Sequence, residues 1–147
     1  METLEKVKIL EDKQAIQELT HNYLAAADRK DHVTMAAHFT SDGVLTSVMD
    51  EQTVVLHGTT EISNGFAQIL ASIHTAYHLV GQLLIDLNGN TAKGTSYSFV
   101  TLVGTENNQK YVRKIWAVYK DEYVKENDQW LINNRVATVA WEEKEFY

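Results

Sequence analysis

The histidines are the side chains of this sequence best suited to proton transfer near neutral pH. A neutral imidazole, with an ordinary pKa of about 6.5, takes a proton from carbon or oxygen and returns it. Two of the six, His74 and His78, have the i, i+4 spacing of a helical zinc pair. The segment between them leads into a predicted strand and has no nearby glutamate, and the other four histidines are scattered. The sequence therefore predicts no metal site, which leaves acid–base catalysis as the chemistry open to these side chains.

Several cofactor and nucleophile classes are excluded by what the sequence lacks. There are no cysteines, which excludes disulfides, thiolate nucleophiles, iron–sulfur clusters and cysteine-bound zinc. No glycine-rich phosphate loop and no Gly-x-Ser-x-Gly elbow occur in the sequence. We therefore expect neither nucleotide-dependent chemistry nor a serine hydrolase.

Length and charge narrow the class of protein. A chain of 147 residues with 44% apolar side chains suits one domain over residues 1–147. The formal net charge is −7, and no lysine–arginine cluster offsets repulsion from phosphate, which argues against a nucleic-acid partner. The N-terminal residues lack the apolar core of a signal peptide, and no apolar run approaches the ~20 residues that span a bilayer. We expect a cytoplasmic protein without a membrane partner.

Helical spacing marks three segments. Residues 4–27 carry one apolar stripe and predict a long helix ending near Asp28, with Asp12 as a candidate cap for its second part. Asp31 is placed to cap a short second helix. Residues 61–71 predict a third helix, again with one apolar side.

The rest of the chain has the alternation and the turn signals of β-structure. Asp42-Gly43 has turn chemistry and is predicted to end the segment of the second helix. Asn88-Gly89 is a strong signal for a tight hairpin, and Asn107-Asn108 and Asn127-Asp128 mark two further turns. The predicted strands are residues 44–48, 53–56, 77–87, 91–103, 111–124 and 130–141. Helices segregated from a meander predict an α+β fold, in which three helices cover one face of a six-stranded, mostly antiparallel, curved sheet.

Several stretches of the sequence, spread over nearly the whole chain from Asp12 to Trp141, match one family. They are residues 14–19, Tyr23, 27–31, 39–43, 56–58, 77–79, 129–132 and Arg135. These stretches resemble the SnoaL-like family of the nuclear transport factor 2-like superfamily, and within it the branch of scytalone dehydratase and bile-acid 7α-dehydratase. The resemblance implies a cone-shaped sheet with the helices on its concave side; it is specific for the fold rather than for the activity.

The resemblance also implies an active site. These enzymes use an aspartate at the end of the first long helix and a histidine at the start of the third strand, and this chain has Asp28 and His78 there. Tyr23, five residues before Asp28, matches a tyrosine of the bile-acid enzyme. The three residues are therefore the candidate catalytic group.

Part of the implied catalytic group is missing from this sequence. Scytalone dehydratase has a second catalytic histidine on the following strand, where residues 94–97 of this chain offer none. The additional aspartate and arginine of the bile-acid enzyme fall near Val100 and Val139, which cannot replace them. Either the reaction differs, or the pocket no longer catalyses anything.

The chemistry of the remaining pair follows from its groups. A carboxylate on one imidazole nitrogen fixes the tautomer and stabilises the imidazolium that forms, and Asp28 with His78 would make such a dyad. Tyr23 would donate a hydrogen bond to a developing enolate or a departing hydroxyl. The leading hypothesis is a cofactor-independent lyase, isomerase or cyclase that acts on a small, mostly apolar carbonyl compound. Further pocket residues are expected to be Tyr97, Tyr119 and Asn133.

Each candidate catalytic residue also has a structural explanation. Asp28 could be a solvated residue where a helix stops. Strict alternation places His78 opposite the leucines of its strand, so it points away from the core unless Gly81 marks a bulge. Tyr23 lies in the middle of the apolar stripe and could be a core aromatic with a satisfied hydroxyl.

Two other functions remain open at this point. One is a non-catalytic pocket that binds a small ligand, and the other is an assembly module built on the same fold. For an assembly module, the exposed face of the sheet would bind a large partner. Otherwise the aromatic residues of the long strands, such as Trp116 and Trp141, predict self-association through the outer face of the sheet. We expect a homodimer or a homotrimer.

Overall fold

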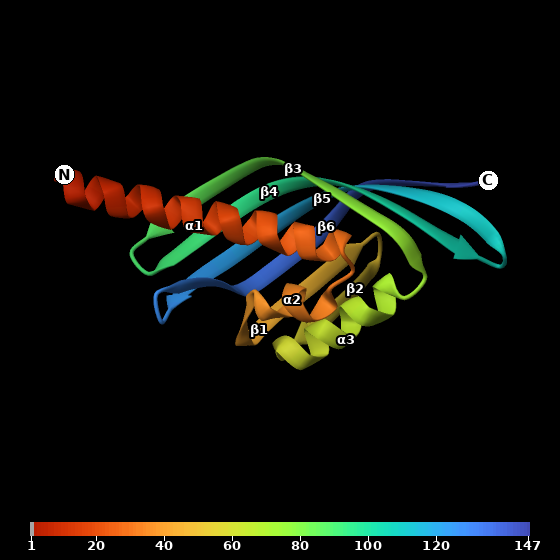
Figure 1. The fold of residues 1–147 in the computed structure, drawn as a ribbon, viewed down its shortest axis with the longest axis horizontal. Coiled ribbons are helices and arrows are strands. Elements are labelled where there is room, and N and C mark those ends of the chain that lie inside the picture. The colour runs from red at the N-terminus through yellow and green to blue at the C-terminus, as the bar shows by residue number, and fades with distance from the viewer. Residues whose placement is uncertain (1) are drawn as a thin grey trace.

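The computed structural model describes residues 2–147. Three helices, α1 (Thr3–Asp28), α2 (His32–Ala37) and α3 (Gly58–Leu70), lie on one face of a curved sheet (Figure 1). The six strands are β1 (Phe39–Met49), β2 (Gln52–His57), β3 (Ile73–Asn88), β4 (Thr91–Glu106), β5 (Gln109–Glu126) and β6 (Gln129–Phe146). The predicted α+β class is confirmed.

The sheet has the strand order β2-β1-β6-β5-β4-β3. All neighbouring strands are antiparallel except β1 and β6, which pair in parallel. The sheet is therefore mostly antiparallel, as predicted. The β4–β5 hairpin and the end of β6 extend beyond the helices, at the opposite end of the molecule from the start of α1 (Figure 1).

The cap of the second helix and the asparagine hairpin turns form where the local sequence predicts them. The carboxylate of Asp31 accepts a hydrogen bond from the Thr34 backbone N–H at 3.1 Å and caps α2. Both residues of each predicted asparagine turn, Asn107-Asn108 and Asn127-Asp128, have positive φ, which a two-residue hairpin turn requires. The β3–β4 turn is equally tight: Asn88 pairs with Thr91.

Two local predictions are wrong. Helix α1 is continuous, and Asp12 does not cap a second part of it. Its carboxylate instead accepts hydrogen bonds from Lys125 Nζ and Trp130 Nε1, both at 3.0 Å, and joins α1 to the sheet. Asp42-Gly43 does not turn the chain after α2, because β1 begins at Phe39 and runs through both residues. Pairing with β6 overrides the local turn preference, with a shift of register between Phe39 and Val44.

The core forms between the helices and the inner face of the sheet. Its central side chains, such as Ile16 of α1, Ile62 of α3 and Ile132 of β6, are fully buried. A second apolar cluster continues along the inner face of β3, β4 and β5, beyond the ends of the helices. A cavity lies between the helices and this inner face.

Candidate functional site

A bulge in β3 decides which way His78 points. Between Val80 and Leu83 the register with β4 shifts, because Gly81 and Gln82 stand opposite a single residue, Tyr97. Before the bulge, His78 and Val80 lie on the inner face of the sheet. After it, Leu83, Ile85 and Leu87 lie on that face. Gly81 therefore does mark a bulge, and His78 points inward.

Asp28 and His78 form a hydrogen-bonded pair. The Oδ1 atom of Asp28, at the last residue of α1, lies 2.7 Å from Nδ1 of His78. The imidazole is 11% exposed and the carboxylate 31% exposed. Since a carboxylate accepts, Nδ1–H is the donor, and Nε2 is left as the nitrogen that can take a proton. The loop after α1 is fixed near the start of β3 by Lys30, whose Nζ donates to the Ile73 carbonyl at 2.6 Å.

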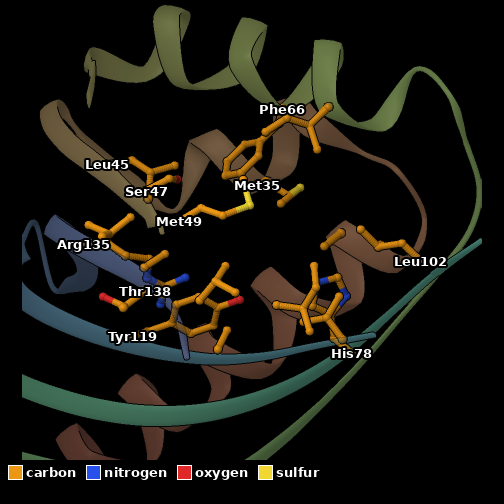
Figure 2. Close-up of a pocket in the computed structure, with 18 of the residues that line it drawn as sticks. Met35, Leu45, Ser47, Met49, Phe66, His78, Leu102, Tyr119, Arg135 and Thr138 are labelled. Atoms are coloured by element: carbon orange, nitrogen blue, oxygen red, sulfur yellow. The ribbon is translucent and has the colours of Figure 1, made fainter. Parts of the chain in front are cut away.

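His78 lies on the wall of an apolar cavity of about 220 Å³. Figure 2 shows Leu102 next to His78. Tyr119 lies between His78 and Arg135 (Figure 2). The remaining walls are mostly aliphatic and aromatic, and come from α1, α2, α3 and four strands. Examples are Met35, Leu45, Phe66, Val100 and Ile115. A small molecule in this cavity would be largely shielded from water.

Arg135 brings a buried positive charge to the cavity. Its side chain is 1% exposed, and it is held by Asp121, with Nε–Oδ1 at 2.7 Å and Nη2–Oδ2 at 2.9 Å. Burial opposes the charge, but the Asp121 carboxylate more than offsets it, and the pKa of Arg135 lies well above its ordinary value. The third nitrogen, Nη1, is buried and has no hydrogen-bond partner among the described residues. Arg135 also lines the cavity, so a guanidinium with one spare N–H donor group forms part of the cavity wall.

Two tyrosines flank this guanidinium. The Cζ atom of Arg135 lies 4.5 Å from the ring centre of Tyr23 and 4.7 Å from that of Tyr119. Burial raises the pKa of both phenols above the ordinary value, although the charge of Arg135 opposes the shift. Both hydroxyls therefore stay protonated at neutral pH and are able to donate hydrogen bonds. Tyr23 also makes edge-on contacts with the rings of Phe39 and Phe66, so it has a packing role as well.

The structure brings four of the six predicted site residues together. His78, Tyr23 and Tyr119 line the cavity, and Asp28 stands behind His78. Tyr97 does not line it: Tyr97 is 43% exposed on the outer face of the sheet, because it alternates along β4 with the buried Ser96 and Ser98. Asn133 lies outside the cavity too, where the register of β5 and β6 shifts, and its Oδ1 accepts from Thr40 at 3.1 Å.

The sequence analysis missed Arg135 as a site residue. It placed the family's arginine near Val139, whereas the fully buried arginine of the cavity wall is Arg135, four residues earlier on β6. A signal was present in the pattern of alternation. Asp121 and Arg135 are opposite charges at inward positions of neighbouring strands, and they stand directly opposite each other in the register.

Possible metal ligands are not grouped in this fold. Among residues 2–147, no cluster of three histidine, aspartate or glutamate side chains is placed to hold an ion. His74 and His78 lie on different faces of β3, and His74 contacts the Thr105 hydroxyl instead, at 2.7 Å. Within the same described range, no helix has the length and apolar character to span a membrane.

Comparison with family models decides the family. The model of the SnoaL-like domain matches residues 8–136. The chain belongs to this family. No curated protein matches the sequence of this SnoaL-like domain significantly.

Solved structures share the fold. A protein from Novosphingobium aromaticivorans, provisionally assigned as a scytalone dehydratase, is 18% identical with a TM-score of 0.81, over 94% of this chain and 90% of that one. The hexachlorocyclohexane dehydrochlorinase LinA-type3 from Novosphingobium barchaimii is 18% identical with a TM-score of 0.81, over 95% and 94%. A protein of unknown function from Mycobacterium tuberculosis is 25% identical with a TM-score of 0.74, over 93% and 75%. The likeness covers almost this whole SnoaL-like domain.

Proposed function

We propose that this protein is a cofactor-independent lyase that eliminates water or a hydrogen halide from a small, mostly apolar molecule. One arrangement carries the proposal: His78, backed by the Asp28 carboxylate, and the buried guanidinium of Arg135, which has one unpaired nitrogen, share the wall of one apolar cavity. The fold neighbours named as a dehydratase and a dehydrochlorinase support the same reaction class.

His78 is the proposed general base. Its Nε2 would take a proton from a carbon that lies next to a carbonyl group or to the carbon that carries the leaving group. The Asp28 carboxylate holds the imidazole as the Nδ1–H tautomer and stabilises the imidazolium that forms. The electron pair of the broken C–H bond would form the new C=C bond.

Arg135 is the proposed partner for the negative charge. The leaving group would depart with its bonding electron pair and become negatively charged. Either this atom or an enolate oxygen would accept a hydrogen bond from Nη1 of Arg135. Tyr119 and Tyr23, whose phenols stay protonated, would add O–H donors on the same side. The proton held on His78 would then be transferred to the departing hydroxide, or lost to solvent when the leaving group is a halide.

A two-probe assay tests the function. The parent protein is incubated with 3-hydroxycyclohexanone, whose dehydration gives an absorbing enone, and with hexachlorocyclohexane, whose elimination releases chloride. We expect a rate above buffer for at least one probe, and a loss of about 10²–10⁴-fold in His78→Gln. The matched control is His21→Gln, since His21 is exposed on α1 and lies outside the cavity.

The same assay separates the lyase from the other functions. Binding of either probe without turnover would favour a non-catalytic pocket and contradict the proposal. Turnover that survives in His78→Gln would contradict the role assigned to the imidazole.

A further inference from the structure

Three side chains that hold or accept a positive charge line the cavity, and one of them has no part in the proposed reaction. The three are His78, Arg135 and Arg113, and Arg113 is the unused one. No aspartate or glutamate of residues 2–147 lines the same walls, although acidic residues outnumber basic ones by 20 to 13 in the sequence. Cationic groups alone around an apolar cavity favour an anionic ligand.

Arg113 is held by a carboxylate that does not line the cavity. The Oε2 atom of Glu142 accepts hydrogen bonds from its Nε at 3.1 Å and from its Nη2 at 2.6 Å. Asp28 and Asp121 hold the other two cationic groups in the same way, and neither of them lines the cavity. In all three pairs the cationic partner is therefore the one that a ligand in the cavity meets.

A bulge in β6 brings Glu142 to the inner face of the sheet. Ala140 is an extra residue in the register with β5. Val139 lines the cavity, so regular alternation would send Glu142, three positions later, to the outer face. With the extra residue, Glu142 stands opposite Ile115, which lines the cavity too. The bulge thus makes the pair with Arg113 possible.

Arg113 stands at the open end of the cavity. Strand β5 supplies every second residue of one wall, in the order Tyr119, Ala117, Ile115 and Arg113. The guanidinium of Arg135 lies beside Tyr119, and its side chain is 1% exposed, whereas that of Arg113 is 24% exposed. The two guanidinium groups therefore belong to opposite ends of this wall, and Arg113 is at the end that solvent reaches.

The guanidinium of Arg113 keeps donors for a ligand. Both bonds to Glu142 use its Nε–Nη2 edge. Nη2 also donates to the sulfur of Met49 at 3.0 Å, and Nη1 takes part in none of these contacts. Met49 points into the cavity from the last position of β1 (Figure 2). A thioether is a weak acceptor on a flexible side chain, so a stronger acceptor would displace it.

We infer that Arg113 binds a carboxylate of the substrate, so that the proposed lyase acts on a carboxylic acid with an apolar body. Nη1 and the Nη2 atom that faces Met49 form the edge of a guanidinium that meets a carboxylate with two parallel hydrogen bonds. The ligand group is a monoanion, because Arg113 is the single charged side chain that lines this end of the cavity. The substrate class rests on the proposed function, whereas carboxylate binding is measured without turnover.

Two matched probes test the inference. 3-Cyclohexylpropanoate carries an apolar ring and a carboxylate, and 3-cyclohexylpropanamide is its neutral counterpart. Isothermal titration calorimetry of the parent protein should give a dissociation constant at least about tenfold lower for the carboxylate probe. Equal constants, or no binding of the carboxylate probe, would overturn the inference and leave an elimination rate in the two-probe assay unaffected. A preference for the carboxylate probe without any elimination would support the site and contradict the lyase.

Substitutions locate the carboxylate site. Arg113→Gln should remove the preference for the carboxylate probe and leave the affinity for the amide probe unchanged. The matched control is Lys114→Gln, which removes the same charge one position along β5, from an exposed residue outside the cavity. This control should retain the preference. A preference that survives in Arg113→Gln, or that is lost equally in Lys114→Gln, would overturn the inference.

A second variant keeps the inference testable if Arg113→Gln does not fold. Glu142→Gln keeps the shape of the side chain but neutralises the carboxylate that competes for the guanidinium. We expect this variant to bind the carboxylate probe about threefold to tenfold more tightly than the parent, with the amide probe unaffected. An ion pair that only joins β5 to β6 predicts no such gain. Unchanged or weaker binding of the carboxylate probe would therefore overturn the inference.

Discussion

The Oδ1 atom of Asp28 lies 2.7 Å from Nδ1 of His78, although the two residues are 50 positions apart in the chain. The end of α1 lies against β3, and Lys30, two residues after Asp28, donates a hydrogen bond to the Ile73 carbonyl at the start of that strand. The hydrogen bond between Asp28 and His78 fixes the tautomer that leaves Nε2 of His78 as the base. Asp28 is therefore not simply a solvated residue at the end of a helix, because its carboxylate is hydrogen-bonded to His78.

Asp28→Asn should therefore disturb the tautomer of His78. The amide keeps the shape of the side chain, but its NH₂ group can turn toward the ring and favour the tautomer protonated at Nε2. With that tautomer the base is blocked, and we expect the elimination rate to fall by about 10²–10⁴-fold. Nitrogen-15 NMR of the imidazole measures the tautomer directly.

Asp86→Asn is the matched control, because Asp86 is exposed on β3 and lies outside the cavity. It should leave both the imidazole spectrum and the rate unchanged. An unaltered His78 spectrum in Asp28→Asn would mean that the hydrogen bond does not set the tautomer.

Substitution of Arg135 should lower the free energy of unfolding of the protein. Arg135→Met leaves the buried Asp121 carboxylate without its guanidinium, and breaking a buried pair in this way costs about 3–5 kcal/mol. The double variant Arg135→Met with Asp121→Asn removes the unpaired charge and should recover part of this loss. Urea unfolding of the three proteins measures the free energies. If the double variant were no more stable than the single one, the Asp121 charge would not be the cause.

Local signals predicted the elements of this fold and the hairpins between β3 and β6, but not the contacts between segments far apart in the chain. The Asp31 cap and the asparagine turns act within a few residues, so the sequence contains the whole interaction. The parallel pairing of β1 with β6 joins segments far apart in the chain, and it carries β1 through Gly43. Asp12 is a similar case, because its partners Lys125 and Trp130 lie more than a hundred positions away.

Family resemblance predicted the residues of the candidate site, but not the strand register that decides which of them face the cavity. Resemblance placed Asp28 and His78, but one extra residue in β3 decided their contact, since it resets the alternation of the strand. Tyr97 was placed in the pocket without a rule for its face, and the structure puts it on the other side. Arg135 required the register of β5 with β6, which a single sequence does not specify.

The acid stability of the protein should depend on Asp12. Burial opposes its charge, but hydrogen bonds from Trp130 and Lys125 lower the pKa of Asp12 below the ordinary 3.8. A lowered pKa contributes stability that is present above pH 3.8 and is lost as the pH falls through the folded-state value. Asp12→Asn should thus be less stable than the parent at pH 7, by about 1 kcal/mol or more, and the difference should shrink in acid. Unfolding curves measured at neutral and at acidic pH test this, and a difference that does not change with pH would contradict it.

Three buried phenols should limit stability at high pH. Burial raises the pKa of Tyr23, Tyr119 and Tyr123 above the ordinary 10.0. A raised pKa means that their stabilisation is complete below pH 10.0 and is lost as the pH rises beyond it, because only the unfolded chain ionises them readily. Phenolate absorbance should thus rise in two steps, the second together with the loss of the circular dichroism of the sheet. Tyr23→Phe keeps the ring beside Arg135 and should reduce the second step by one tyrosine, with the first step unchanged. Complete ionisation of all seven tyrosines before unfolding would show that the cavity around Arg135 is open to water.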